Sequence, residues 1–387
     1  MRHLELIATA TFGLEALVAE ELQKLGYTET KVESGKVTFP GDERAICRAN
    51  LWLRTAARVR IKVGEFKATT FEELFEQTKA LPWADYLPKN AAFPVEGRSV
   101  KSTLFSVSDC QAIVKKAVVE SLKKKHHLEW FPEDGPVMKI EVAILKDVAT
   151  LTIDTSGASL HQRGYREIAG EAPLKETLAA ALVILARWYP DIPFIDPFCG
   201  SGTIPIEAAL IGHNIAPGLN RSFAAGDWPW IDPKLWQEAQ EEARSLINPA
   251  KPDYLIGTDI DDSVLKTARR NAELAGVGGS IHFQRQEVKD ISTSKKYGKL
   301  VCNPPYGERL GETSEVSKLY RELAQAKKKL DTWSFYILTA YPHLEKVFGQ
   351  PATKRRKLYN GNIECQYYQY FGPKPPKRRP ERDQAAP

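Results

Sequence analysis

After a short apolar run at residues 300–302, the chain carries Asn303, Pro304, Pro305 and Tyr306. The two prolines fix the backbone and donate no N–H, so strand pairing has to end there. The Asn303 amide oxygen and the Pro304 carbonyl are then rigid hydrogen-bond acceptors beside an aromatic ring. Such acceptors can hold an amine by its hydrogens. A strand-ending turn with a packed tyrosine is the alternative interpretation, and these four residues alone leave both open.

A second candidate site is a glycine-containing turn between a predicted strand and a predicted helix, in the sequence FIDPFCGSGT. Ligands bind at such turns in doubly wound sheets, because glycines allow close approach and a helix N-terminus favours an anion. The turn lacks the third glycine of a dinucleotide fingerprint and the Gly-Lys-Ser/Thr of a phosphate loop. The residues expected to form the site are Asp196, Cys199, Gly200, Gly202 and Thr203. We interpret Cys199 as a packing residue, since its neighbours supply no base.

The next predicted strand ends in GTDIDD, which places Asp259 and Ile260 at the same edge of the sheet. An acidic side chain there can accept hydrogen bonds from both hydroxyls of a ribose, and Ile260 can flank an adenine. The separation from Gly202 exceeds the usual ~20 residues, and an inserted segment, roughly residues 213–250, accounts for the excess. These features suit a ligand with an adenosine and a carboxylate but no phosphates, and S-adenosylmethionine fits that description.

With such a cofactor, the hydrogen-bond acceptors at Asn303 and Pro304 can be interpreted as the part of the site that orients the methyl acceptor. The exocyclic amine of a nucleobase is a poor nucleophile, because its lone pair is delocalised into the ring. The Asn303 oxygen and the Pro304 carbonyl can hold that amine in line with a methyl group, so catalysis would consist mostly of positioning and electrostatics. Tyr306 can stack on a base that has been rotated out of its helix. The expected chemistry is methyl transfer to an amine.

The elements that position these residues form an α/β fold. After residue 170, strands alternate with helices, which predicts a parallel, doubly wound sheet. A terminal hairpin over residues 355–371, with Asn360 and Gly361 as a type I′ turn, adds an antiparallel edge. The first 155 residues mix helices and strands in small units without a glycine loop, and Ser108 is the predicted N-cap of a helix there.

Composition limits the alternatives. The 387 residues allow two or three domains. The net charge is +5, but residues from 351 onward contribute nine Lys and Arg against three Asp and Glu, so the rest of the chain is about −1. A polyanion-binding surface must therefore come from local clusters. The arginine-rich strand at 54–62 and the basic run at 123–127 are candidates for phosphate contacts, with solvated faces as the alternative.

No apolar run is long enough to span a membrane, and the charged N-terminal stretch argues against a signal peptide. The five cysteines are isolated in sequence, so neither a zinc site nor a disulfide framework is expected. A reducing cytoplasm fits best.

Two motifs, DPFCGSGTIPIEAA and NPPYGERL, together resemble the methyltransferase domain of bacterial 23S ribosomal RNA guanine-N2 methyltransferases. These enzymes are often labelled N6-adenine-specific DNA methylases. The resemblance extends through LHQRGYREIAGEAPLKETLAAAL and PGLNRSFAAGDWPW, and the N-terminal part resembles a ferredoxin-like segment followed by a THUMP RNA-binding domain. The implied domains are 1–50 (ferredoxin-like), 51–157 (THUMP), 158–372 (methyltransferase) and 373–387 (a disordered basic tail).

The resemblance also assigns residues by position. It places Asp196, Gly200 and Gly202 in the cofactor loop, Asp259 at the ribose, and Asn303, Pro304 and Tyr306 at the target amine. An acidic residue after the third strand of the sheet contacts the adenine in related enzymes, which leaves Glu287 or Asp290. Contacts to RNA are expected from Arg163 and Arg166 in the connector and from Arg309, with surface ion pairs or loop anchoring as the alternative.

The predicted function is therefore transfer of a methyl group from S-adenosylmethionine to the N2 amine of a guanine in 23S ribosomal RNA, near the peptidyl-transferase region. The expected partner is this RNA or a large-subunit precursor particle, and the expected state is a monomer without a metal or a membrane contact. Alternatives are an N6-adenine DNA methyltransferase and a tRNA guanine-N2 methyltransferase. A non-catalytic RNA-binding assembly factor would be expected to have lost Asn303 or the glycine loop.

Overall fold

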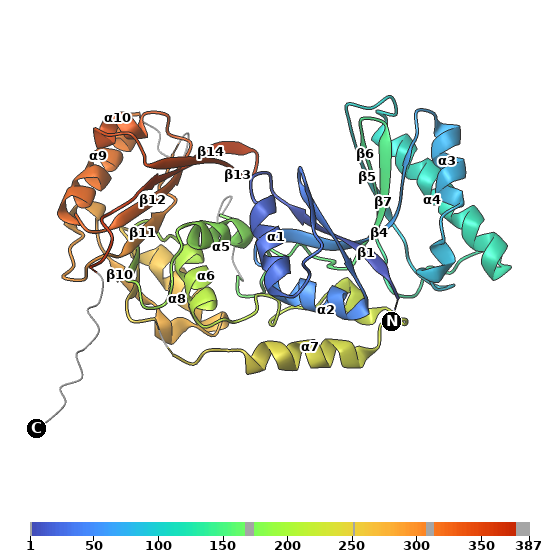
Figure 1. Cartoon of the computed structure of the whole chain (residues 1–387), viewed down its shortest axis with the longest axis horizontal. Helices are drawn as coiled ribbons and strands as arrows, with labels where there is room; N and C mark the ends of the chain where they lie inside the picture. The colour runs from blue at the N-terminus through green and yellow to red at the C-terminus, as the bar shows by residue number, and fades with distance from the viewer. Residues whose placement is uncertain (1, 167–173, 251, 307–312, 377–387) are drawn as a thin grey trace, which may run out of the picture. The chain divides into compact units, whose positions relative to one another are not determined.

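The chain folds into two compact units (Figure 1). The computed structural model describes residues 2–166, 174–250, 252–306 and 313–376. The first unit comprises residues 1–181 and 213–249, and the second comprises residues 182–212 and 250–387. The predicted insertion thus folds with the N-terminal part of the chain, although it interrupts the predicted methyltransferase segment.

The first unit is built on a sheet with the order β2-β3-β1-β4-β7-β6-β5. The long strand β4 pairs with β1 on one side and with β7 on the other, which joins the segment predicted to be ferredoxin-like to the segment predicted to be a THUMP domain. The strands are β1 (Leu4–Ala10), β2 (Lys31–Glu33), β3 (Lys36–Gly41), β4 (Ala56–Lys67), β5 (Val95–Val100), β6 (Ile140–Leu145) and β7 (Val148–Asp154). The helices are α1 (Glu15–Lys24), α2 (Glu43–Trp52), α3 (Phe71–Lys79), α4 (Val107–His126) and α7 (Pro233–Ser245).

Local sequence signals explain where several of these helices begin. Asp42 caps α2 by accepting a hydrogen bond from the Ala45 N–H, and Thr70 forms a capping box with Glu73 at α3. The prediction that Ser108 caps a helix is wrong. Helix α4 begins at Val107, so Ser108 already lies in its first turn, and the preceding serine has the extended backbone of the cap.

The inserted segment is attached to the first unit by both charge and apolar packing. Its helix α7 lies against α2, where the Arg48 guanidinium pairs with the Glu242 carboxylate at 2.7 Å. The Trp236 ring stacks on Phe223, with 5.2 Å between centroids, and both side chains belong to the hydrophobic core of the first unit. A cut of the chain near residue 157 would therefore expose apolar surface on the insert.

The second unit confirms the predicted α/β class. Its sheet has the order β10-β9-β8-β11-β12-β14-β13, in which the first five strands are parallel and the last two are antiparallel. The strands are β8 (Phe194–Asp196), β9 (Leu255–Asp259), β10 (His282–Arg285), β11 (Lys299–Cys302), β12 (Ser334–Thr339), β13 (Lys354–Asn360) and β14 (Ile363–Tyr370). The helices are α6 (Thr203–Gly212), α8 (Asp262–Leu274), α9 (Thr313–Lys329) and α10 (Leu344–Phe348), while α5 (Glu176–Leu185) runs through the boundary between the units.

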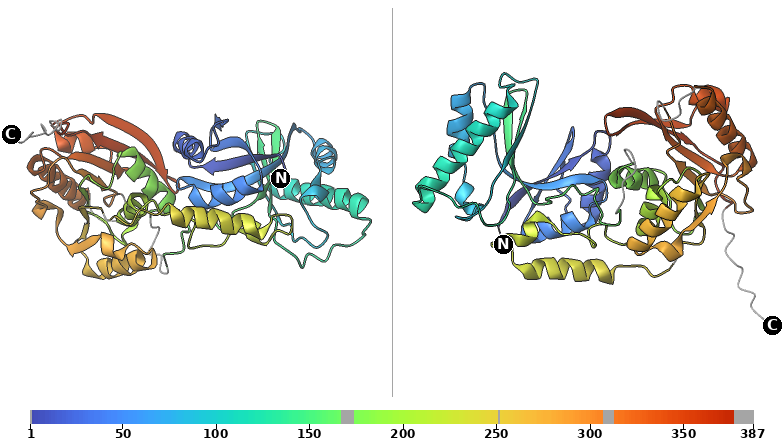
Figure 2. Two further views of the ribbon diagram at one scale, coloured as in Figure 1. Left: turned by 60° about the horizontal axis from the view of Figure 1, so that its bottom comes forward. Right: turned by 180° about the vertical axis from the view of Figure 1, so that it is seen from behind.

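Helices cover both faces of this sheet, with α8 and α9 on opposite sides (Figure 2). The hairpin between β13 and β14 differs from its prediction in the turn. Asn360 pairs with Ile363, so the two loop residues are Gly361 and Asn362, and Gly361 has a φ of +62°. Glycine at the first loop position is the signature of a type II′ turn, not of the type I′ turn expected from Asn360 and Gly361.

Candidate active site

The loop after β8 needs both of its glycines, for different reasons. Gly200 and Gly202 have φ values of +51° and +86°, which favour glycine. A Cβ on Gly202 would lie 3.1 Å from Ala268 Cβ and 3.2 Å from the Phe283 ring, so this position is closed by packing. A Cβ on Gly200 would meet no atom of the described residues within 4 Å. Among those residues, the backbone at Gly200 therefore faces open space that a ligand can fill.

Asp259, at the end of β9, is bonded to this loop. Its carboxylate accepts a hydrogen bond from the Gly200 N–H at 3.0 Å and another from the Asp261 N–H at 3.1 Å. The Cys199 N–H donates to the Thr258 carbonyl at 3.0 Å, which fixes the loop to the same strand. Each carboxylate oxygen of Asp259 retains a second lone pair for a ligand hydroxyl. Two of the sequence-predicted elements of the cofactor site are thus in contact.

Asp196, the last residue of β8, has a buried carboxyl group that can accept further hydrogen bonds. One of its oxygens accepts the Phe198 N–H at 3.1 Å, and the other, Oδ2, is buried without a hydrogen-bond partner among the residues that the structure describes. Burial, and secondarily the charge of Asp259, raises the pKa of Asp196 well above its usual value. A cationic ligand group beside Asp196 would stabilise the ionised form of this carboxyl group, and the ammonium of an amino acid is one such group.

The neighbouring loop positions are also enclosed. Cys199 and Thr203 are 6% exposed, and Thr203 is the first residue of α6. Burial raises the pKa of the Cys199 thiol well above its usual value, which keeps it protonated. This supports a packing role for Cys199 and argues against a nucleophilic one.

Sequence reasoning missed Asn271, which supports the glycine loop from behind. Its side-chain amide donates to the Ser201 carbonyl at 3.0 Å, and the residue is buried. Asn271 lies on the face of α8 that also buries Leu265 and Ala268. An uncharged polar residue on an otherwise apolar helix face was the available signal, because a buried amide needs a partner.

Asn303 follows β11, and β11 pairs in parallel with β8, so their carboxyl ends lie at the same edge of the sheet. The Asn303 Oδ1 atom is buried and has no hydrogen-bond partner within the described part of the chain. Pro304 is buried beside it. A buried acceptor without a donor is costly, so its retention indicates a donor that the described residues do not supply.

The backbone after Asn303 is braced from two sides. The Tyr306 hydroxyl receives hydrogen bonds from the Asn360 amide at 2.9 Å and from the Cys365 thiol at 3.4 Å, both on the terminal hairpin. From α9, the Tyr320 hydroxyl donates toward the Pro305 carbonyl at 3.4 Å. Tyr306 is only 6% exposed, so its main described role is anchoring, and its stacking on a base stays a prediction.

The residues predicted around the adenine are exposed. Ile260 is an apolar side chain with 63% exposure at the end of β9, as a residue that flanks a planar ligand would be. Glu287 pairs with Lys289 at 2.6 Å, and the hydrogen bond and charge of Lys289 lower the pKa of Glu287. Asp290 is exposed as well. The choice between Glu287 and Asp290 stays a prediction.

Two predicted RNA contacts have structural roles instead. Arg163 is 3% exposed, and its guanidinium donates to the carbonyls of Leu160 and Arg54 at 2.7 and 2.5 Å. Arg166 pairs with the buried Glu176 at 3.2 Å. Reaching a phosphate would require both arginines to leave these partners, so their assignment as RNA contacts is not supported. Arg309 lies outside the described residues.

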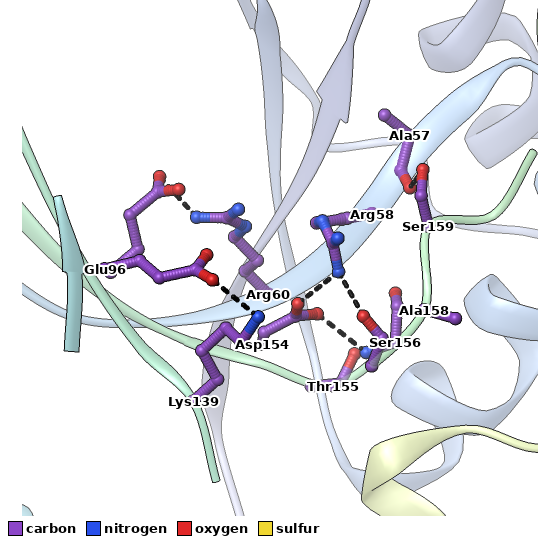
Figure 3. A network of polar contacts seen from close by, with 12 residues as sticks. Ala57, Arg58, Arg60, Glu96, Lys139, Asp154, Thr155, Ser156, Ala158 and Ser159 are labelled. Atoms are coloured by element: carbon purple, nitrogen blue, oxygen red, sulfur yellow. Dashed lines mark hydrogen bonds and ion pairs between the residues drawn. The ribbon is translucent and has the colours of Figure 1, made fainter. Parts of the chain in front are cut away.

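The arginines of β4 form internal contacts too, which corrects their interpretation as phosphate contacts. Arg58 pairs with Asp154 at 2.5 Å (Figure 3). Arg60 pairs with Glu141 and is 7% exposed. Arg54 lies just before β4, and its guanidinium donates to the Ile215 carbonyl at 2.6 Å. In the other predicted basic cluster, the lysines at 124 and 125 are exposed. That cluster stays a candidate.

Comparison of this sequence with known proteins identifies the family to which the chain belongs. A family described as "RMKL-like, methyltransferase domain" matches residues 163–369, "RlmL ferredoxin-like domain" matches residues 5–60, and "THUMP domain" matches residues 68–154. YpsC of Bacillus subtilis, named as a candidate RNA methyltransferase, is 54% identical over 98% of this chain and 99% of its own length. The chain belongs to the RMKL-like methyltransferase family.

Solved structures of similar proteins agree with this membership. A Listeria monocytogenes protein, described as a predicted N6-adenine-specific DNA methylase, is 56% identical over 96% of this chain and 97% of its own, with a TM-score of 0.92. The methyltransferase-like protein SMU.472, solved with S-adenosylhomocysteine (SAH), is 45% identical over 97% of this chain and 100% of its own, also with a TM-score of 0.92. TrmN of Thermus thermophilus, at 22% identity and a TM-score of 0.68, shares the fold over 95% of this chain and 99% of its own.

This member of the RMKL-like family is an S-adenosylmethionine-dependent methyltransferase, as the site geometry and the SAH complex of a relative indicate. Among the residues described, no helix has the length and apolar character needed to cross a membrane. No cluster of three potential metal ligands occurs in the same described set.

Proposed function

We propose that this enzyme methylates the exocyclic N2 amine of a guanine in 23S ribosomal RNA. The observation that carries the proposal is Oδ1 of Asn303, which is buried without a hydrogen-bond partner among the described residues. It lies on a loop that holds two prolines, at the same sheet edge as the cofactor loop. A THUMP domain and an RlmL ferredoxin-like domain on the same chain favour RNA over DNA. The guanine and the large-subunit RNA rest on the family resemblance of the two motifs.

In the mechanism that follows, S-adenosylmethionine supplies an electrophilic methyl group. Asp259 would hold the ribose hydroxyls, and the absence of a side chain at Gly200 would let the ligand lie against the backbone. Oδ2 of Asp196, which has no partner among the described residues, would accept a hydrogen bond from the ammonium. Asn303 Oδ1 and the Pro304 carbonyl would accept the two hydrogens of the target amine and so fix its orientation. The amine proton becomes acidic once nitrogen has gained the methyl group, and solvent can accept it.

The alternatives differ in substrate, not in site. The Listeria monocytogenes protein carries a name that points to N6-adenine in DNA, and the same acceptor pair can orient an adenine amine. We favour RNA because the whole first unit carries no residue of the cofactor site yet contains the THUMP domain. The proposed partner is ribosomal RNA or a large-subunit precursor, bound by a cytoplasmic monomer.

The test is mass spectrometry of ribosomal RNA nucleosides from cells with and without the gene. We expect one N2-methylguanosine to disappear from large-subunit RNA in the deletion strain. Wild-type protein should restore it, and the Asn303→Ala variant should not. Unchanged N2-methylguanosine in ribosomal RNA, together with a loss of methylated base from DNA or tRNA, would contradict the proposal and select one of the alternatives.

Tyr320→Phe is expected to slow methyl transfer by about 2- to 10-fold, the value of one hydrogen bond. The substitution removes the hydroxyl that donates toward the Pro305 carbonyl and contacts Thr339 at 2.6 Å. Cofactor affinity, measured by calorimetry, should stay unchanged. Tyr341→Phe is the matched control, because that ring stacks on Tyr320 at 4.6 Å but its hydroxyl contacts Ser317. Equal rate losses in both variants would show a general packing effect.

Asp196→Asn is expected to stabilise the cofactor-free protein at alkaline pH and to weaken cofactor binding. Because the folded-state pKa of Asp196 is raised, its contribution to stability is present below the ordinary carboxyl range and is lost as pH rises through the folded pKa. Removing the charge should recover about 1–3 kcal/mol there. Thermal unfolding across pH measures this, and calorimetry measures cofactor affinity. An unchanged cofactor affinity would remove Asp196 from the site.

A further inference from the structure

Asn360 is the last residue of β13 and does not belong to the loop of the terminal hairpin. It pairs with Ile363, so the loop consists of Gly361 and Asn362, which are both exposed. Asn360 itself is 9% exposed. Asparagine is depleted in strands, and a buried amide needs hydrogen-bond partners. Turn formation therefore does not explain the asparagine at this position.

The Asn360 amide is bonded to the loop that follows β11. Its Nδ2 atom donates to the Tyr306 hydroxyl at 2.9 Å, and the Cys365 thiol contacts the same hydroxyl at 3.4 Å. Cys365 is in register with Leu358, two residues before Asn360, so both groups lie on one face of the hairpin. Burial raises the pKa of the Cys365 thiol, which keeps it protonated and able to donate. We call Asn360 and Cys365 the hairpin socket.

Tyr306 contacts this socket from a loop that begins three strands away. In the sheet order, β12 and β14 lie between β11, the strand before this loop, and β13 (Figure 1). Three strand spacings amount to roughly 14 Å. The Tyr320 hydroxyl contacts both the Pro305 carbonyl at 3.4 Å and Thr339, the last residue of β12, at 2.6 Å. Residues 303–306 therefore cross the carboxyl end of β12 on the way from β11 to the hairpin.

This path holds the proposed acceptors between two fixed ends. Asn303 directly follows β11 at one end, and Tyr306 is bonded to the hairpin socket at the other. Pro304 and Pro305 have fixed φ angles, so few backbone rotations remain between the two ends. Without the bond at Tyr306, the Pro304 carbonyl and the Asn303 side chain would be free to change orientation. A displacement of about 1 Å in a positioning group can lower a reaction rate by roughly 10²-fold.

We propose that Asn360 is a positioning residue for methyl transfer. By holding the Tyr306 hydroxyl, it keeps the acceptors at Asn303 and Pro304 in the orientation that the target amine requires. It acts through Tyr306 and not on the reacting atoms, and Cys365 assists it. The inference rests on the proposed role of those two acceptors, and it gives the antiparallel hairpin at the edge of the sheet a part in the reaction.

The test is a double-mutant cycle on the full-length protein. Asn360→Ala and Tyr306→Phe each remove one partner of the bond, and each should slow single-turnover methylation by about 5- to 100-fold. The double variant should be no slower than the slower single variant, because the same bond is already lost. The affinity for S-adenosylmethionine and the KM for the substrate should equal those of wild type. Rate losses that multiply in the double variant would overturn the proposal.

Asn362→Ala is the matched control, because it removes an exposed asparagine from the loop of the same hairpin. Its rate should equal that of wild type, and a loss as large as that of Asn360→Ala would overturn the proposal. Asn360→Asp is the conservative variant. An aspartate can accept a hydrogen bond from the Tyr306 hydroxyl when ionised and donate one when protonated, so the bond persists. Its rate should lie between those of wild type and Asn360→Ala.

Crystal structures with S-adenosylhomocysteine give a readout that needs no substrate. In Asn360→Ala, the Tyr306 ring and the Pro304 carbonyl should be displaced or disordered relative to wild type, while the cofactor loop at Gly200 keeps its position. An undisplaced Pro304 carbonyl in Asn360→Ala would overturn the proposal. The proposed function fails separately, if wild-type protein methylates DNA or tRNA and not 23S ribosomal RNA, and the cycle then uses the substrate that is methylated.

Discussion

Asn303→Ala is expected to lower the rate of methyl transfer by about 10²- to 10³-fold or more, while the affinity for S-adenosylmethionine stays within a factor of two or so. The reason is that Oδ1 of Asn303 is buried and has no hydrogen-bond partner in the part of the chain that the structure describes, so it can accept the target amine. The residues that we assign to the cofactor lie on other strands. Single-turnover methylation gives the rate, and calorimetry gives the affinity.

Asn303→Asp is the conservative variant for this experiment. It keeps an acceptor oxygen but adds a negative charge, so we expect partial activity between wild type and alanine. A cofactor affinity that falls as steeply as the rate in Asn303→Ala would contradict the assignment, because Asn303 would then belong to the cofactor site.

Asp259→Ala is expected to show the opposite pattern. It should weaken cofactor binding by about 1–3 kcal/mol, roughly 5- to 150-fold in the dissociation constant, for the loss of a charged hydrogen-bonding group. The loss has two parts, since the Asp259 carboxylate both faces the predicted ribose position and accepts the Gly200 N–H. Transfer at saturating cofactor should be much less affected. Calorimetry on the purified variant measures the constant directly.

The matched control is Asp262→Ala, at the first residue of α8, whose carboxylate is near Lys266 and Arg269 and accepts no bond from the glycine loop in the described structure. Its affinity for the cofactor should equal that of wild type. If Asp259→Ala also keeps wild-type affinity, Asp259 is a loop anchor and no part of the binding site.

The second unit could be predicted well because its signals are local. Alternation of strands and helices predicted the α/β class, and the motif around Gly200 and Gly202 placed the loop after β8. The contact between Asp259 and Gly200 follows from parallel strands ending at one edge. Nothing in the sequence near Asn271 or Tyr320 reveals which backbone each side chain supports, since their partners are fixed only by tertiary packing.

The first unit shows where local patterns mislead. An arginine on alternate positions of a strand looks the same whether it faces solvent or a neighbouring strand. In β4 the partners are Asp154 of β7 and Glu141 of β6, which come from distant parts of the chain. For the same reason, the sequence did not reveal that the inserted segment packs into the core of the N-terminal part, because these contacts depend on long-range packing.

The most direct test of the proposed reaction is methylation in vitro with an isotope-labelled methyl donor. Purified full-length protein is incubated in parallel with unmodified 23S ribosomal RNA, unmodified tRNA and duplex DNA, and each digest is read by mass spectrometry. Our account predicts labelled N2-methylguanosine from the 23S RNA with wild-type protein and none with Asn303→Ala. Label in N6-methyladenine of DNA, or in tRNA but not in 23S RNA, would contradict it.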